Sequence, residues 1–95
     1  MEISKCLTIS ITHITQETKH KLEFEELLND MGLTVYKKAE FGYWIYIPED
    51  FCWSSYIDLP IDLWQCMLIA YENNCQWLCL DRDGKETKLL PVYSW

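Results

Sequence analysis

Residues 5–13 alternate strictly between two sets of side chains. One set consists of Leu7, Ile9, Ile11 and His13, and small polar residues or cysteine occupy the positions between them. Successive side chains of a β-strand point to opposite faces, so this period of two predicts a strand with one buried face. The fold must therefore contain a sheet, and we expect this first strand at its centre.

A helix and a hairpin are predicted to follow this strand. Thr15 offers an N-cap hydroxyl, and Gly32 ends the helical pattern. The apolar positions at helical spacing are Phe24, Leu27, Leu28 and Met31. Residues 33–38 and 43–47 are rich in β-branched and aromatic residues around a short connection with a glycine, which predicts two hairpin strands.

The second half of the chain predicts another helix and strand. Asp58 can cap a helix with Pro60 in its first turn, and Asn73-Asn74 closes it. Residues 76–81 alternate as a fourth strand before a strong turn sequence. Residues 49–59 have no period and are expected to form an aromatic loop, and residues 89–95 an edge strand or extended arm.

The predicted element order is β-α-β-β-α-β in a single domain, residues 1–95, of the α+β class. This order indicates a ferredoxin-like sheet with both helices on one face and two right-handed crossovers. The alternation then assigns six residues to the open face: Thr8, Ser10, Tyr36, Trp44, Tyr46 and Trp77. Three covers for this face are conceivable: the C-terminal arm with Tyr93 and Trp95, a second copy in a homodimer, or a different partner.

Charge and composition restrict the partners and the compartment. The formal net charge of −7 repels phosphate backbones and anionic membranes, and it favours a basic protein surface. No apolar run is long enough for a membrane span and no signal peptide is evident, so a cytoplasmic protein is expected. The five cysteines are an odd number without secretory context and indicate reduced thiols rather than a disulfide framework.

The sequence contains no catalytic signature, so we expect neither an enzyme nor a cofactor. Cys75, Cys79 and His13 lack the second cysteine pair of a zinc site, and the acidic turn at residues 81–86 lacks the ligand register of a calcium loop. His13 is expected to form a hydrogen bond near the start of the first helix. An aromatic sheet face can also stack nucleic-acid bases, but such faces lie beside basic clusters, and this chain has only Lys37-Lys38.

Three stretches carry a resemblance to a known family: residues 5–15 (KCLTISITHIT), 41–51 (FGYWIYIPEDF) and 74–84 (NCQWLCLDRDG). With the ending LPVYSW, they resemble small, acidic, uncharacterised proteins that bacteriophages and mobile elements encode. This context is similar to that of inhibitors of host defence, including anti-CRISPR proteins that occupy the basic channel of a nuclease. The resemblance implies a context and carries no mechanism.

The resulting hypothesis is a small acidic protein-binding module, such as an inhibitor of a host defence nuclease. The expected contact residues are acidic phosphate mimics on the first helix and apolar anchors elsewhere: Glu23, Glu25, Glu26, Asp30, Trp44, Tyr46 and Trp53. The alternatives are a small enzyme or ligand-binding protein with an unrecognised site, and an aromatic-face nucleic-acid binder. For each acidic residue the competing explanation is a solvated surface charge.

Overall fold

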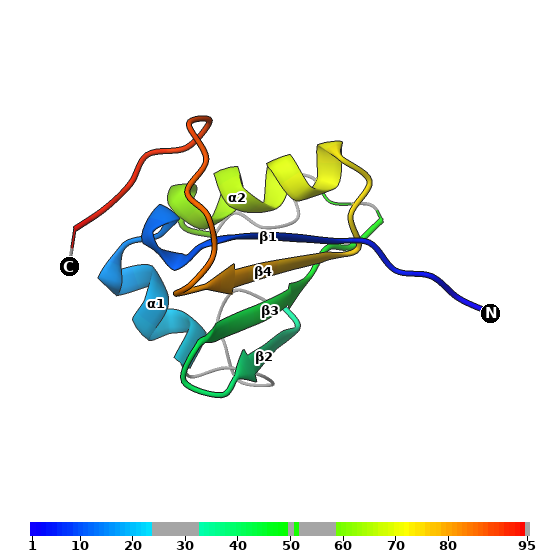
Figure 1. Cartoon of the computed structure of the whole chain (residues 1–95), viewed down its shortest axis with the longest axis horizontal. Coiled ribbons are helices and arrows are strands. Elements are labelled where there is room, and N and C mark those ends of the chain that lie inside the picture. The colour runs from blue at the N-terminus through cyan, green and yellow to red at the C-terminus, as the bar shows by residue number, and fades with distance from the viewer. Residues whose placement is uncertain (24–32, 50, 52–58, 95) are drawn as a thin grey trace.

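A computed structural model describes residues 1–23, 33–49, 51 and 59–94 of the chain (Figure 1). Its elements are the strands β1 (Cys6–Ser10), β2 (Val35–Lys38), β3 (Gly42–Tyr46) and β4 (Trp77–Asp81), the helices α1 (Gln16–Glu23) and α2 (Ile61–Glu72), and the 3-10 turn η1 (Ile11–His13). The small α+β fold is therefore confirmed. Figure 1 shows α2 running along β1 and β4, with α1 at the end of the sheet where β1 ends.

The four strands form one mixed sheet in the order β1-β4-β3-β2. β1 and β4 are parallel, and the other two neighbouring pairs are antiparallel. β1 therefore lies at an edge, so the expectation of a central first strand was wrong, and the ferredoxin-like order is not confirmed. α2 connects two antiparallel neighbours, β3 and β4, so the second predicted crossover is also absent from this sheet.

The first strand is shorter than its alternating sequence suggested. The Ser10 hydroxyl accepts a hydrogen bond from the Thr12 amide at 3.2 Å and caps η1, which turns the chain out of the sheet. His13 is the last residue of this turn and is buried. Its ring contacts residues 87 and 91 of the C-terminal arm, so the expected bond near the helix start was wrong. A side chain that competes with the sheet for backbone hydrogen bonds thus ended the strand early.

The core lies between the helices and one face of the sheet. Its strand residues are Ile9, Val35, Tyr43, Ile45, Leu78 and Leu80, and its helix residues include Leu22, Leu63, Met67 and Ala70. Leu22 comes from α1 and the other three from α2, so both helices cover the same face, as predicted. Neither of the two described helices therefore covers the opposite face of the sheet.

The predicted caps are confirmed in part. The Thr15 hydroxyl accepts from the Thr18 amide at 3.2 Å, which caps α1 as expected. The N-cap of α2 is Pro60, which was expected in the first turn, so the helix begins two residues later than a cap at Asp58 would give, and Asn73 is its C-cap as expected. Asp58, Gly32 and the apolar positions from Phe24 to Met31 lie outside the described residues.

The hairpin and the fourth strand are confirmed. β2 and β3 pair from Val35 and Ile45 to Lys38 and Gly42. A Cβ atom at Gly42 would lie 1.8 Å from the Leu80 carbonyl oxygen of β4, so only glycine permits this approach of two strands. The sequence after β4 forms an extended arm, with Leu90 buried and the Tyr93 amide bonded to the Thr12 carbonyl at 2.8 Å.

Candidate functional site

The open sheet face is the candidate functional site, and the strand register fixes its side chains. Three rows cross the sheet: Cys6, Trp77 and Tyr46; then Thr8, Cys79, Trp44 and Tyr36; then Ser10, Asp81, Gly42 and Lys38. The aromatic residues come from three adjacent strands, and the β1 positions carry only small side chains. The face thus combines a group of four aromatic residues, Tyr36, Trp44, Tyr46 and Trp77, which we call the aromatic block, with the small residues of β1.

Three of the aromatic side chains of the face, Tyr36, Tyr46 and Trp77, contact one another through Trp77. The ring centroids of Tyr36 and Trp77 lie 6.2 Å apart, and those of Tyr46 and Trp77 lie 5.4 Å apart in an edge-to-face arrangement. Tyr36 is 53% exposed and Tyr46 is 37% exposed. The two tyrosine rings thus pack against Trp77 while remaining accessible to a partner.

A hollow of about 330 Å³ lies within this face, and we call it the aromatic hollow. Its lining residues are Cys6, Tyr36, Trp44 and Trp77. None of the four side chains is charged, so the hollow is suited to an apolar group or to the face of a planar cation. The C-terminal arm contributes no residue to this lining, because its described part packs at η1 instead.

An ion pair forms the corner of the face next to the aromatic block. The Lys38 ammonium lies 2.5 Å from an Asp81 carboxylate oxygen and 5.2 Å from the centroid of the Trp44 ring. The hydrogen bond from Lys38 lowers the pKa of Asp81, and the same bond raises the pKa of Lys38. Both groups are therefore charged at neutral pH, and together they add no net charge to the face.

The two cysteines of the face are small and uncharged. Partial burial raises the pKa of both the Cys6 and the Cys79 thiol above the usual cysteine value. A thiol with a raised pKa is protonated at neutral pH and is a poor nucleophile. Cys6 is therefore a small, weakly polar part of the surface, and the buried Cys79 lies beneath it, so the two are not an activated pair.

A family model covers nearly all of the chain, including the strands of this face. The C-terminal domain of DUF5983, a family of unknown function, matches residues 6–95. The chain belongs to this family. No curated protein and no solved structure matches it.

In this DUF5983 domain, two of the predicted contact residues lie on the open sheet face. Trp44 and Tyr46 project from β3 as the alternation predicted. Glu23 lies on α1, where it pairs with Lys19 at 2.7 Å, and that bond lowers the pKa of Glu23. Glu23 is on the helix side of the sheet, away from Trp44 and Tyr46. The remaining predicted contacts lie outside the described residues: Glu25, Glu26, Asp30 and Trp53.

Several residues of the site were missing from the predicted contact set. Tyr36 and Trp77 had been assigned to the open face by alternation, and that assignment is confirmed. Cys6 and Lys38 could not be placed, because their positions beside Trp77 and Asp81 depend on the pairing of β1 and β2 within the sheet. In the sequence, the period of two indicated which residues share the open face. The strand register was needed to show which of them are neighbours.

No group of three His, Cys, Asp or Glu side chains in the described ranges could hold a metal ion. Among the helices that the structure describes, none is long and apolar enough to cross a membrane.

Proposed function

We propose that this DUF5983 domain is a protein-binding module whose open sheet face is the docking surface. The observation that carries the proposal is the aromatic block of Tyr36, Trp44, Tyr46 and Trp77, which neither helix covers and which the arm leaves free. No hydrogen bond joins the polar tips of these side chains to another residue in the described part of the chain. Phenol and indole groups are thus available to a partner.

The physical argument is the energetics of aromatic contacts. Tyrosine and tryptophan bury a large area and lose little conformational entropy, since they have few rotatable bonds. The rings already pack against each other, so a partner orders few additional side chains on binding. The face is therefore suited to act as the central cluster of a protein interface.

Charge favours a basic protein over nucleic acid as the partner. The net charge of −7 attracts basic surfaces and repels phosphate backbones. On the face itself, the Lys38 ammonium is paired with Asp81. If a nucleic-acid base stacked on the aromatic block, the three rows of the face would offer no unpaired basic side chain to bind its phosphate.

The narrower proposal is an inhibitor, encoded by a phage or mobile element, that occupies the basic nucleic-acid channel of a host nuclease. The acidity of the chain and the aromatic anchors Trp44 and Tyr46 support it. Its acidic phosphate mimics on the first helix extend beyond the described residues. Self-association of two copies through the same face is the competing arrangement, and two charges of −7 oppose it.

The test uses the tyrosine pair Tyr36 and Tyr46, which are exposed and not needed for the core. The double variant Tyr36→Thr, Tyr46→Thr keeps β-propensity and removes both rings. The matched control is Leu89→Gln, which removes an exposed apolar side chain from the arm. A partner captured from lysate of the host cell is first identified by mass spectrometry, and its affinity for each purified variant is then measured by calorimetry.

We expect the double variant to lose about tenfold or more in affinity, in line with about 1–2 kcal/mol for each lost aromatic contact, and the control to bind as the native protein does. Equal binding of all three proteins would show that the face is not the docking surface. A nuclease whose cleavage the native protein blocks, and the double variant does not, would support the inhibitor proposal. Sedimentation equilibrium of the native protein alone measures self-association.

A further inference from the structure

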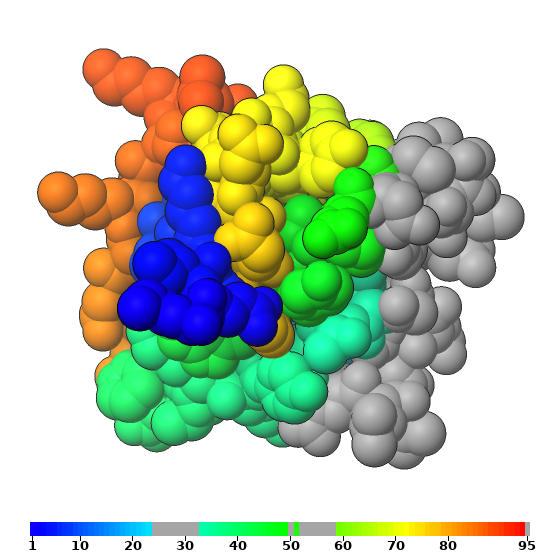
Figure 2. Space-filling view, turned by 90° about the vertical axis from the view of Figure 1, so that its right-hand side faces the viewer, coloured from blue at the N-terminus to red at the C-terminus, as the bar shows by residue number. Residues whose placement is uncertain are grey.

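A second hollow lies at the end of the molecule where β4 begins, the end that Figure 2 presents. It has a volume of about 390 Å³, and its lining includes Glu49, Tyr71, Glu72 and Gln76. We call it the acidic hollow. Gln76 of this lining is followed directly by Trp77 of the aromatic hollow, so the two linings adjoin along the chain at the start of β4.

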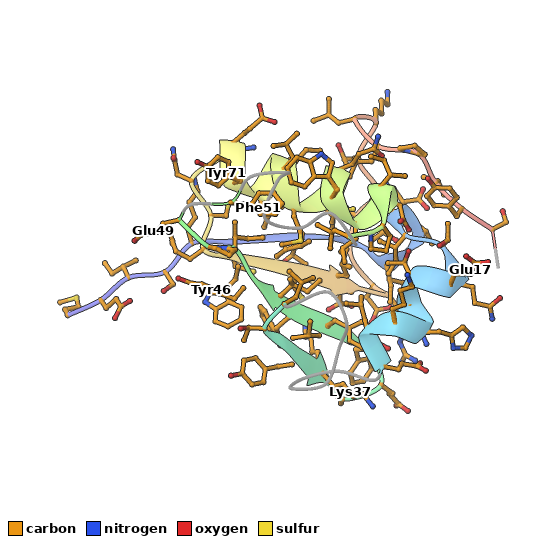
Figure 3. The ribbon with its side chains drawn as sticks, turned by 180° about the vertical axis from the view of Figure 1, so that it is seen from behind. Glu17, Lys37, Tyr46, Glu49, Phe51 and Tyr71 are labelled. Carbon is orange, nitrogen blue, oxygen red and sulfur yellow. The ribbon has the colours of Figure 1, made fainter. Side chains whose placement is uncertain are left out.

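The acidic hollow has negative charge without a matching cation. Glu49 and Glu72 are the only charged residues of its lining, and neither forms an ion pair with another residue that the structure describes. Figure 3 shows Glu49, Tyr46 and Tyr71 at the same end of the molecule, with Glu17 at the opposite end. A cation that enters this end therefore meets two carboxylates and the ring of Tyr71.

The end of α2 adds to this negative potential. The last turn of α2 carries no basic residue, and the carbonyl end of a helix bears partial negative charge. The Lys5 ammonium lies 2.9 Å from the Asn73 carbonyl oxygen, so the helix end already attracts one cation of the chain. Lys5 does not line the acidic hollow.

We propose that the two hollows together bind an extended, arginine-containing segment of a basic partner protein. One guanidinium pairs with Glu49 and Glu72 in the acidic hollow, and a neighbouring arginine stacks on the rings of the aromatic hollow. The proposal rests on the proposed function and names the chemistry of the docked segment. Charge complementarity selects this occupant, because a second copy of the chain would bring another −7 to a surface that is already acidic.

Arginine suits both hollows better than a compact ammonium does. Its planar guanidinium forms paired hydrogen bonds with carboxylates and stacks on aromatic rings. The structure already contains one such contact, since the Arg82 guanidinium carbon lies 4.4 Å from the centroid of the Phe41 ring. Successive residues of an extended chain advance about 3.3 Å, so a short segment is long enough to place two arginines at different points of the surface.

The experiment compares a peptide Gly-Ser-Arg-Gly-Arg-Ser-Gly with the same peptide carrying citrulline in place of both arginines. Citrulline keeps the length and planarity of arginine and removes the charge. Binding is followed by NMR of the labelled protein, with the indole N–H signals of Trp44 and Trp77 reporting the aromatic hollow. We expect the arginine peptide to shift both signals and to bind about fivefold or more tightly than the citrulline peptide.

Variants separate local pairing from overall charge. Glu72→Gln and Glu49→Gln are each expected to lower the affinity for the arginine peptide by about twofold to fivefold. Glu17→Gln removes the same charge at the opposite end and is expected to change the affinity by less than that. The double variant Tyr36→Thr, Tyr46→Thr is expected to lower the affinity for the arginine peptide as well.

Three results would overturn the inference: equal affinity for both peptides, an equal loss from Glu17→Gln and Glu72→Gln, or no shift of the two indole signals. The proposed function fails separately. If an identified partner depends on Tyr36 and Tyr46 but binds Glu49→Gln and Glu72→Gln variants normally, the docking surface stands and the arginine segment is wrong.

Discussion

Lys38 and Asp81 decide the polarity of the open sheet face at the residue scale. Each is one of the few charged side chains on this face, and their ion pair leaves the aromatic block beside a neutral corner. The Asp83 amide also donates to Asp81 at 2.8 Å, so the carboxylate is held by two partners. An uncompensated charge in this place would change which partners the face accepts.

The ion pair predicts a pH-dependent contribution to stability. The pKa of Asp81 is lowered on folding, so its contribution is present above the unfolded value of about 3.9 and is lost as the pH falls through the folded pKa. The pKa of Lys38 is raised, so its contribution is present below about 10.4 and is lost as the pH rises through the folded pKa. We expect the native protein to be more stable than Lys38→Met near neutral pH.

The difference in the free energy of unfolding between the two proteins is measured by urea titrations at pH values from about 2.5 to about 8, a range that includes the ordinary carboxylate pKa. It should shrink toward the acid end, because Asp81 becomes protonated in both states. A difference that stays constant over the whole range would contradict the assignment, and would indicate that only packing of the lysine stem on Trp44 is lost.

At the element scale, a buried carboxylate joins the starts of the two helices. Asp62 in the first turn of α2 is 5% exposed and accepts hydrogen bonds from the Thr15 amide at 2.7 Å and from the Thr18 hydroxyl at 2.7 and 2.9 Å. These donors lie at the start of α1. A helix depends largely on tertiary contacts when it is short, so Asp62 fixes α1 over the core.

We expect Asp62→Asn to lower the free energy of unfolding by about 1–3 kcal/mol, because an amide replaces a charged acceptor and leaves buried donors poorly satisfied. Asp83→Asn is the control, since the Asp83 side chain is 78% exposed. That control should stay within about 0.5 kcal/mol of the native protein in the same thermal or urea titration. Equal stability of Asp62→Asn and the native protein would show that Asp62 does not connect the helices energetically.

At the scale of the whole molecule, His13 attaches the C-terminal arm to the body. Its Nδ1 lies 2.8 Å from the Pro91 carbonyl oxygen, and its Nε2 accepts from the Thr87 amide at 2.9 Å. A carbonyl oxygen only accepts, so the proton must be on Nδ1. Figure 1 shows the arm running past the end of the sheet where β1 ends, which keeps it off the open sheet face.

The two hydrogen bonds of the His13 ring predict a local effect of His13→Ala. We expect faster hydrogen exchange of the Thr87 amide and faster proteolysis within residues 85–94, together with a loss of about 1–3 kcal/mol in stability. His20→Ala removes an exposed imidazole, 62% accessible, and should change neither exchange nor cleavage of the arm. Unchanged exchange at Thr87 in His13→Ala would mean that other contacts, such as the one from Tyr93 to Thr12, hold the arm alone.

The sequence by itself determined which side chains share a face. In β1, β3 and β4 the period of two separated the core residues Ile9, Ile45 and Leu78 from the open residues Thr8, Trp44 and Trp77, because adjacent strand residues must point in opposite directions. Local signals also determined the hairpin and the Thr15 cap. These features depend on neighbours along the chain.

Only the tertiary structure decided which strands are neighbours. Alternation gives the face of a residue but not its partner across the sheet, so it could not place β1 beside β4 or Cys6 beside Trp77. The hollow that these pairings form, the Lys38 and Asp81 contact, and the attachment of the arm to His13 all join residues far apart in sequence. Such contacts depend on the packing and hydrogen bonding of the whole chain, which no local period encodes.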